Sequence, residues 1–304
     1  MPSKDHYYGG QAVLEGVMMR GRDVWAIAVR RPDQTVHVES HEIRSIGRRI
    51  PLLTKPGFRG VLAMGQAISI GVRALTISAN QAVEDEEQLS PVQMGVSMVL
   101  AFVLFLGLFV VAPYLGFRLL RHRVESSIVR NVLEGVLRVL LFLGYLALVG
   151  RLKDVRRVFQ YHGAEHKTIA AYEHDEPLEP ATVDRYSTLH VRCGTNFLLI
   201  VMILTILIYA AFPARSLLAG ILLRLVAIPV IAGLSYEMLR LGARYQRSAL
   251  MRALMAPGLW LQKITTKPPD RGQIQVAIES FQEVLRREGN LSPSSDPPQP
   301  AAGP

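Results

Sequence analysis

The chain has 304 residues, of which 50% are hydrophobic, and it carries a formal net charge of +9 at pH 7. Its apolar residues are gathered into long runs, which argues against a soluble protein of one or two domains and favours an α-helical integral membrane protein. Many basic residues flank those runs, so membrane orientation explains the positive charge and no nucleic-acid partner is expected.

Residues 1–60 are predicted to form a small cytosolic α+β region. The opening residues MPSKDHYYGG contain no apolar segment typical of a signal peptide, so none is expected. Residues 25–43, WAIAVRRPDQTVHVESHEI, alternate apolar and polar side chains on either side of a Pro-Asp-Gln turn. That alternation predicts a β-hairpin.

Residues 61–90 are predicted to form an amphipathic or interfacial helix followed by an acidic linker. The segment 58–83 has apolar residues at helical spacing with small residues between them, but it is more polar than the runs that follow. The acidic run from Glu84 to Glu87 then separates this helix from the first predicted span. A charged run of this kind is typical of a solvated linker.

Four apolar runs come next, and each is a candidate transmembrane helix. They cover residues 92–117, 132–150, 197–214 and 217–238. A helix needs about 20 residues to cross the hydrocarbon core of a bilayer. The runs are expected to form a first transmembrane hairpin over 91–150 and a second over 197–239, which gives about four spans.

Two arginines lie inside the predicted spans. Arg138 follows Glu134 by one helical turn, so these two side chains can pair within their own helix. Arg224 lies in the fourth span. A charge at this depth either extends toward the headgroups or belongs to an intramembrane polar site, and the sequence leaves both interpretations open.

The distribution of basic residues predicts which side of the membrane each loop occupies. The 151–196 loop contains seven lysines and arginines, whereas the connection between the third and fourth runs contains one. The positive-inside rule therefore assigns this loop and both termini to the cytoplasm of a multi-pass protein in the cell inner (plasma) membrane. The basic connection at 118–131 argues against this orientation. In the favoured orientation, the three large polar segments meet on one side and could build a shared site.

The 151–196 loop contains the pattern YHGAEHKTIAAYE at 161–173. His162 and His166 are four residues apart and share one face of a helix, so both imidazoles can reach one metal ion. Glu165 completes an H-x-x-E-H pattern, as in inverted zincins, where the histidines hold zinc and the glutamate acts as general base. The sequence therefore predicts a divalent-metal site, with zinc as the first candidate and Glu165 as the catalytic residue.

Two histidines do not complete a metal site, so further ligands are needed. His190 and Cys193, in LHVRCGTN, have an H-x-x-C spacing that suits a pair of zinc ligands. Four protein ligands would make a structural site, whereas three would leave a position open for catalysis. Glu173 lies on the same helical stripe but ~10 Å further along the axis than His166, so it could join only if the helix breaks. The alternative is that all of these are ordinary polar residues at the membrane surface.

The C-terminal region 240–288 is expected to be cytosolic or interfacial. Its segment PGLWLQKITTKPPD combines Trp260 with basic residues, which suits the headgroup region of a bilayer. A polar helix is predicted from Gln273 to about Arg287. Residues 289–304 are rich in Pro, Ser and Gly and are predicted to be disordered.

Four motifs resemble those of one known family. They are GGQAVLEGVMMRG, YHGAEHKTIAAYE, LHVRCGTNF and PGLWLQKITTKPPDRGQIQVAI, and the resemblance extends from about Gly9 to about Leu285. These segments are similar to the YqhQ-like family of bacteria, a domain of unknown function described as predicted metal-dependent membrane enzymes. The resemblance implies metal-dependent activity at a membrane, and it implies no particular substrate.

The resemblance also directs attention to two further places. In GGQAVLEGVMMRGRD, Glu15 could present a carboxylate to a metal, and Arg20 could bind a phosphate or carboxylate group. The same glycines could instead permit only a turn that enters the β-hairpin. Glu237 ends the fourth predicted span at the cytoplasmic interface, where it could face the same site.

Two functions from different classes fit these observations. The first is a metal-dependent hydrolase whose site lies at the cytoplasmic membrane interface, with peptide, lipid-linked or phosphorylated substrates all compatible. The alternative is a non-enzymatic membrane scaffold or regulatory protein with a structural His/Cys metal site. Membrane lipids are the expected partners, and a homo-oligomer is a further possibility. A transporter is disfavoured, because four spans would need oligomerisation to enclose a pathway.

Overall fold

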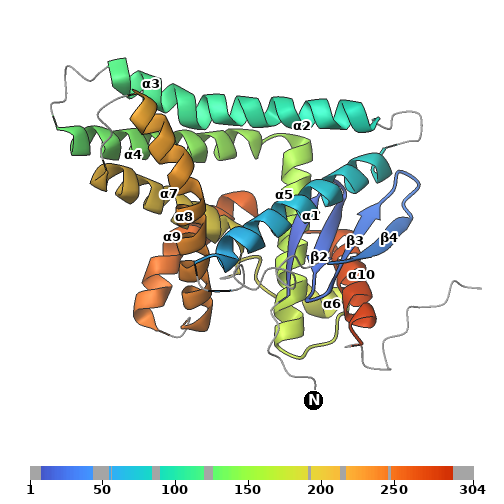
Figure 1. Ribbon diagram of the computed structural model, residues 1–304. Helices are drawn as coiled ribbons and strands as arrows, with labels where there is room; N and C mark the ends of the chain where they lie inside the picture. Colours follow the sequence, from blue (N-terminus) through green and yellow to red (C-terminus); the bar gives the residue numbers. More distant parts are fainter. Residues whose placement is uncertain are drawn as a thin grey trace, which may run out of the picture.

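The computed structural model is mostly helical, with one small antiparallel sheet near the N-terminus (Figure 1). It describes residues 8–43, 55, 57–83, 90–119, 126–190, 193–212, 217–245 and 248–289. The predicted acidic run from Glu84 to Glu87 and all but the first residue of the predicted disordered tail lie outside the described residues.

The sheet has four strands in the order β1-β2-β3-β4, each antiparallel to its neighbours. The strands are β1 (Gly9–Val13), β2 (Gly16–Arg20), β3 (Val24–Arg30) and β4 (Val36–Glu42). The predicted hairpin is confirmed as β3 and β4. Strands β1 and β2 form a second hairpin, in a segment whose glycines predict a turn, either one that presents Glu15 to a metal or one without a further role. Glu15 lies at its tip with φ of 51°, a left-handed conformation that is uncommon for residues other than glycine.

Helices cover both faces of this sheet. They are α1 (Arg59–Gln81), α5 (Lys153–Glu173) and α10 (Arg271–Arg287). Successive residues of the central strands point to opposite faces and therefore enter different cores. Met19 packs in a cluster with Tyr161 of α5 and Phe281 of α10. Ile27 packs on the other side in a cluster that includes Ala74 of α1. The sheet is therefore a buried layer, and it holds α5 in place from one side.

Helix α10 confirms the predicted polar helix and extends it by two residues at its start. Asp270 and Gln273 form a capping box, in which each side chain accepts a hydrogen bond from the other residue's backbone N–H. One face of the helix is apolar and buried, and it is formed by Ile274, Ala277, Ile278, Phe281 and Leu285. This face packs on the sheet, so part of the C-terminal region belongs to the core of the N-terminal one.

Among the described residues, five helices are long and apolar enough to cross a membrane, one more than the sequence predicts. These candidate spans are Arg59–Gln81, Val92–Phe109, Ile128–Val149, Gly194–Ala211 and Leu218–Gly242. The additional one is α1, which the sequence predicts to be interfacial. The others belong to α2 (Pro91–Leu106) with the π-helical η4 (Gly107–Val111), to α4 (Ser127–Val149), to α7 (Gly194–Ala211) and to α8 (Leu217–Arg244). Helix α3 (Ala112–Leu119) continues directly from η4. Five such helices are compatible with a multi-pass membrane protein.

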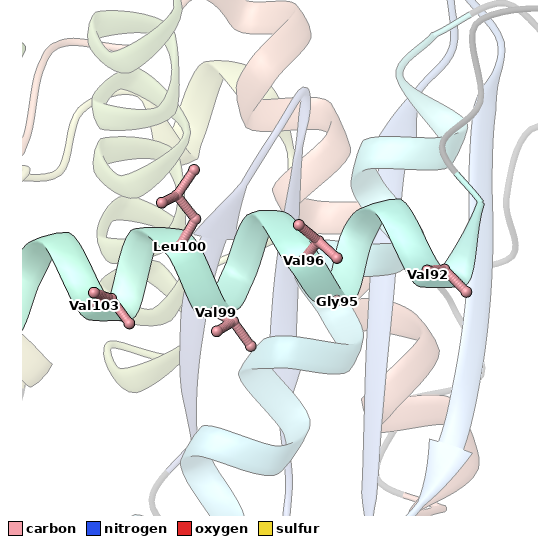
Figure 2. A pocket seen from close by; sticks show the side chains of 6 residues that line it. All are labelled: Val92, Gly95, Val96, Val99, Leu100 and Val103. Carbon is pink, nitrogen blue, oxygen red and sulfur yellow. The ribbon is translucent and has the colours of Figure 1, made fainter.

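The outward faces of the apolar helices are themselves apolar. Only 6% of the segment Val92–Phe109 is buried. Figure 2 shows a shallow hollow along α2, lined by Val92, Gly95, Val96, Val99, Leu100 and Val103. No polar side chain lines it. A continuous apolar face is unfavourable in water and suits lipid or another helix.

Helix α1 contacts both the apolar helix α8 and the sheet. Near its start it crosses α8 so closely that a Cβ at Gly60 would lie 2.9 Å from the Cα of Gly233. Its C-terminal half lies on the sheet, where the Arg73 guanidinium lies 5.7 Å from the ring centroid of Trp25. The C-terminal half of α1 therefore packs on a sheet whose strands carry charged side chains.

Helix α5 starts shortly after α4 ends and runs alongside the sheet, where it contacts β1 and β2 (Figure 1). The short helix α6 (Pro180–Val183) follows it, and α9 (Ala249–Thr265) precedes α10. The chain just after α9 packs against α5 at Gly163, where a Cβ would lie 3.2 Å from the Thr188 side chain and would overlap the Lys267 carbonyl oxygen. Because neighbouring segments pack closely around α5, the side chains of its middle turns are buried.

Candidate metal centre

Helix α5 brings His162 and His166 onto one face, as their spacing predicts, with ring centroids 4.5 Å apart. His166 is 2% exposed, and His162 is half-buried. Burial lowers the pKa of His166 well below its ordinary value, and the neighbouring His162 lowers it further. The His166 ring is therefore neutral at pH 7, which is the form that binds metals.

Both histidine rings are oriented by backbone carbonyls. His162 Nδ1 donates to the carbonyl oxygen of Thr265 at 2.9 Å, and His166 Nδ1 donates to that of Thr188 at 2.5 Å. A carbonyl oxygen can only accept, so Nδ1 carries a proton in both rings, and in the neutral His166 ring Nε2 keeps its lone pair. A hydrogen bond of this kind, opposite the free nitrogen, is usual for histidines that ligate metals.

Cys193 supplies a thiol from the start of α7, where it is the N-cap residue. Its Sγ lies 3.2 Å from His162 Nε2 and accepts hydrogen bonds from the backbone N–H and the hydroxyl of Thr195. Burial raises the pKa of this thiol to about 12, and the nearby Glu165 carboxylate raises it as well. Cys193 is therefore a neutral thiol at pH 7, and it can donate a hydrogen bond to His162.

The three ligand atoms of His162, His166 and Cys193, hereafter the metal group, lie within 4.8 Å of one another. Two imidazole nitrogens and one sulfur form a donor set that zinc favours. Within the described part of the chain, His166 Nε2 is buried and has no hydrogen-bond partner. A metal ion would satisfy that lone pair, so these residues fit a divalent metal.

His190, predicted as a fourth ligand, lies beside the metal group but outside it. Its ring centroid is 5.7 Å from that of His166. Its Nε2 is turned toward Glu173, with 3.3 Å between the nitrogen and the carboxylate oxygen. Helix α5 is unbroken up to Glu173, so this carboxylate is too far along the axis to join the metal group and pairs with His190 instead.

A residue that the sequence analysis missed holds the His190 segment in place. Gln262 of α9 is fully buried; its Oε1 accepts from the backbone N–H of His190, and its Nε2 donates to the His190 carbonyl, both at 2.8 Å. The same Nε2 lies 3.2 Å from Asn196 Oδ1. Gln262 therefore connects α9 to His190 and Asn196, the two residues that lie three positions before and three positions after Cys193. No sequence pattern links it to the histidine motifs.

Glu165 lies next to the metal group without belonging to it. The side chain is 5% exposed and accepts a hydrogen bond from the backbone N–H of Gly10. Burial raises the pKa of this carboxyl to about 7, although His162 and the Gly10 N–H act in the opposite direction. Strand β1 approaches so closely that a Cβ at Gly10 would lie 2.8 Å from Glu165 Cγ. A glycine is therefore required opposite this carboxylate.

Three other predicted site residues bind partners outside the metal group. Glu15 forms a bidentate ion pair with Arg157, Arg20 donates to Gln66 at 2.9 Å, and Glu237 forms a bidentate ion pair with Arg59. Each contact joins two elements of the fold: the β1–β2 hairpin to α5, strand β2 to α1, and α8 to α1. These contacts give Glu15, Arg20 and Glu237 other partners, and the metal group formed by the described residues does not include them, so their place in a shared site stays a prediction.

Comparison with known proteins identifies a family but no activity. Residues 55–287 match the model of a family described as "Protein of unknown function (DUF1385)". The chain is also 34% identical over 300 residues to "Uncharacterized protein YqhQ" of Bacillus subtilis (strain 168), covering 92% of this chain and 93% of that protein. No solved structure matches the chain. The protein therefore belongs to the YqhQ-like DUF1385 family, as its motifs predict.

Proposed function

We propose that the protein is a multi-pass membrane protein that holds a divalent metal ion, zinc first, in the metal group and hydrolyses a substrate at the cytoplasmic membrane interface. The observation that carries this is the convergence of three ligand atoms within 4.8 Å, together with a buried His166 Nε2 that no described residue satisfies. Leaving such an atom unpaired costs about 1–3 kcal/mol. A bound ion would remove that cost.

The proposed membrane placement uses four of the five apolar helices. Spans would be formed by the α2–η4–α3 run, α4, α7 and α8, whose outer faces are apolar and exposed. Helix α1 is assigned to the membrane surface, because its C-terminal half packs on the sheet, and an open sheet edge is not stable in hydrocarbon. Four spans put the sheet and α10 on one side, in agreement with cytoplasmic termini.

The same placement puts the metal group at the membrane surface. Cys193 caps the start of α7, and the residues just after the end of α4 lead directly into α5. Both ends lie on the side that carries the sheet. A substrate could therefore reach the metal group from the cytoplasm or from the headgroup layer of the bilayer.

The residues around the metal group suit hydrolysis. A bound divalent metal supplies Lewis-acid chemistry for cleaving esters, amides or phosphoesters. Three protein ligands are the usual number for a catalytic zinc, whereas structural sites usually have four. Glu165 would take and return a proton, because its carboxylate is fixed beside the metal group by Gly10 and is not used as a ligand.

A structural metal site is the alternative, and one observation favours it. The ligands come from α5 and from the start of α7, and His162 is also hydrogen-bonded to the end of α9. An ion held there would tie the sheet-bound helix to the predicted spans. A scaffold or regulatory protein would need this connection without any reaction.

A Glu165→Gln variant separates the two functions. The metal-loaded wild-type protein and the variant would each be incubated with membrane lipids and peptides from the host, and products would be measured by mass spectrometry. We expect metal-dependent products from the wild type and from the exposed-site control Glu176→Gln. Glu165→Gln should bind the same amount of metal and lose the products. Full product formation by a folded, metal-loaded Glu165→Gln would exclude the hydrolase with Glu165 as its base and leave the structural role.

A further inference from the structure

Helix α9 exposes an apolar face. All exposed side chains that the structure describes between positions 249 and 260 are apolar: Ala249, Leu250, Ala253, Leu254, Pro257 and Trp260. Leu250, Leu254 and Trp260 are 65%, 50% and 66% exposed. Helix α10 also has 17 residues, but its exposed residues are Arg271, Arg286 and Arg287. An exposed apolar face is unfavourable in water, so the face of α9 marks a surface that binds an apolar partner.

Helix α9 touches the ends of two candidate spans. A Cβ at Gly242, where the span Leu218–Gly242 ends, would lie 2.9 Å from Met255 Sδ. A Cβ at Gly258 would overlap Oδ1 of Asn196, which lies in the first turn of α7. In the proposed placement, both span ends lie at the cytoplasmic surface of the membrane. Helix α9 therefore lies at that surface, where the apolar face of a helix is buried about 5–10 Å into the boundary between headgroups and acyl chains.

The C-terminal turns of the same helix hold the surroundings of the metal group. Gln262 is fully buried and binds the backbone N–H and carbonyl of His190, both at 2.8 Å. The carbonyl oxygen of Thr265 accepts from His162 Nδ1 at 2.9 Å. Trp260 lies only two residues before Gln262, so the apolar face and these contacts belong to one continuous helix. A change in the position of α9 therefore moves the carbonyl that orients a proposed metal ligand.

We infer that the apolar face of α9, formed by Leu250, Leu254, Pro257 and Trp260, docks into the cytoplasmic leaflet of the bilayer, and that this docking sets the zinc affinity of the metal group. The bilayer is the occupant because the face adjoins the ends of spans whose outer sides are apolar. Tryptophan is enriched at membrane interfaces. Lys263 is exposed one turn after Trp260, where its amine can reach lipid phosphates while its stem stays on the apolar face. The inference rests on the proposed function and makes the membrane a support of its metal centre.

Spin labels test the docking itself. A nitroxide would be attached to Leu254→Cys, or to the control Arg287→Cys at the exposed end of α10, in the full-length protein in nanodiscs of phosphatidylcholine and phosphatidylglycerol. The wild type treated in the same way gives the background from the buried Cys193. We expect the label at position 254 to collide mainly with oxygen, which partitions into the bilayer, and the label at position 287 to collide mainly with a water-soluble nickel chelate.

Zinc affinity in the same nanodiscs tests the effect on the metal group. Leu254→Ser/Trp260→Ser removes the two largest parts of the apolar face that lie nearest to Gln262. It should bind zinc about tenfold more weakly than the wild type, as the loss of one orienting hydrogen bond implies. The control Val96→Ser/Val103→Ser changes two similarly exposed residues of α2 and should keep the wild-type affinity. Leu254→Met/Trp260→Phe keeps the face apolar and should also keep it.

Three results would overturn the inference. Equal access of the nickel chelate to positions 254 and 287 would show that the face of α9 lies in water. Protection of position 254 from both reagents would assign the face to a protein partner or a second copy of the chain. Unchanged zinc affinity in folded Leu254→Ser/Trp260→Ser, or an equal loss in either of the other two double variants, would show that docking does not set zinc affinity. A wild type that binds no zinc would refute the proposed function, and the spin labels would still decide whether α9 docks.

Discussion

Replacing Gln262 by methionine should weaken metal binding although Gln262 is not a ligand. Methionine has a similar length and volume, so the change removes hydrogen bonds with little loss of packing. Two of those bonds hold the backbone N–H and carbonyl of His190, each at 2.8 Å. At about 1 kcal/mol each, their loss costs about 2 kcal/mol. If the metal-binding arrangement of Cys193 and His162 is destabilised by that amount, zinc affinity falls about thirtyfold.

The assay is a competition titration of purified protein with a chromogenic zinc chelator. A matched control is Gln275→Met, since Gln275 lies on α10 and bonds only to Glu279 among the contacts described. The control should keep the affinity of the wild type. The reasoning is refuted if folded Gln262→Met binds zinc as tightly as the wild type, or if Gln275→Met loses as much affinity.

Two further predictions concern ligand identity and membrane placement. Cys193→Ala should abolish stoichiometric zinc binding. His190→Ala should weaken zinc binding by no more than about tenfold, because His190 acts outside the metal group. Equal losses of zinc affinity in the two variants, measured by equilibrium dialysis, would show that the ligands are wrongly assigned. Trp260 is 66% exposed and is expected at the headgroups, whereas Trp25 is 2% exposed in the sheet. Lipids brominated near the headgroups should therefore quench the fluorescence of Trp25→Phe, which retains Trp260. They should not quench that of Trp260→Phe, which retains Trp25. The reverse pattern would contradict the proposed membrane placement.

Local periodicity was sufficient to predict the first half of the candidate site and one hairpin. The i, i+4 spacing of His162 and His166 fixes their shared face on any helix, whatever the surrounding fold. The alternation in residues 25–43 likewise specifies two strands and a turn before any partner is known. These features depend on neighbours in the sequence, which explains why they could be predicted.

The role of α1 could not be predicted in the same way. Its mean hydropathy of 1.5, against 2.1 to 2.3 for the other candidate spans, lies between a surface helix and a span. What distinguishes it is the packing of its C-terminal half on the sheet, around Ala74 and Arg73. That contact depends on the β1–β2 hairpin, whose glycines also suggest an irregular turn.

The rest of the candidate site depends on contacts that cannot be recognised from the types of residue involved. Thr188 and Thr265 orient the two histidines through their backbone carbonyls, which any residue could provide. His190 matches a ligand by spacing, but its ring faces Glu173, and only the fold brings these two together. Gln262 is 72 residues from the segment it holds. Composition and spacing therefore identify candidate ligands, while tertiary contacts decide which of them converge.

The most direct test of the central claim is the metal content of purified protein, measured by inductively coupled plasma mass spectrometry. The wild type should contain about one equivalent of a divalent metal per chain, and His162→Ala/His166→Ala should contain none. A second double variant, His37→Ala/His41→Ala, changes two histidines of β4 and should keep the wild-type content. Equal metal content in the wild type and in folded His162→Ala/His166→Ala would contradict the metal centre proposed here.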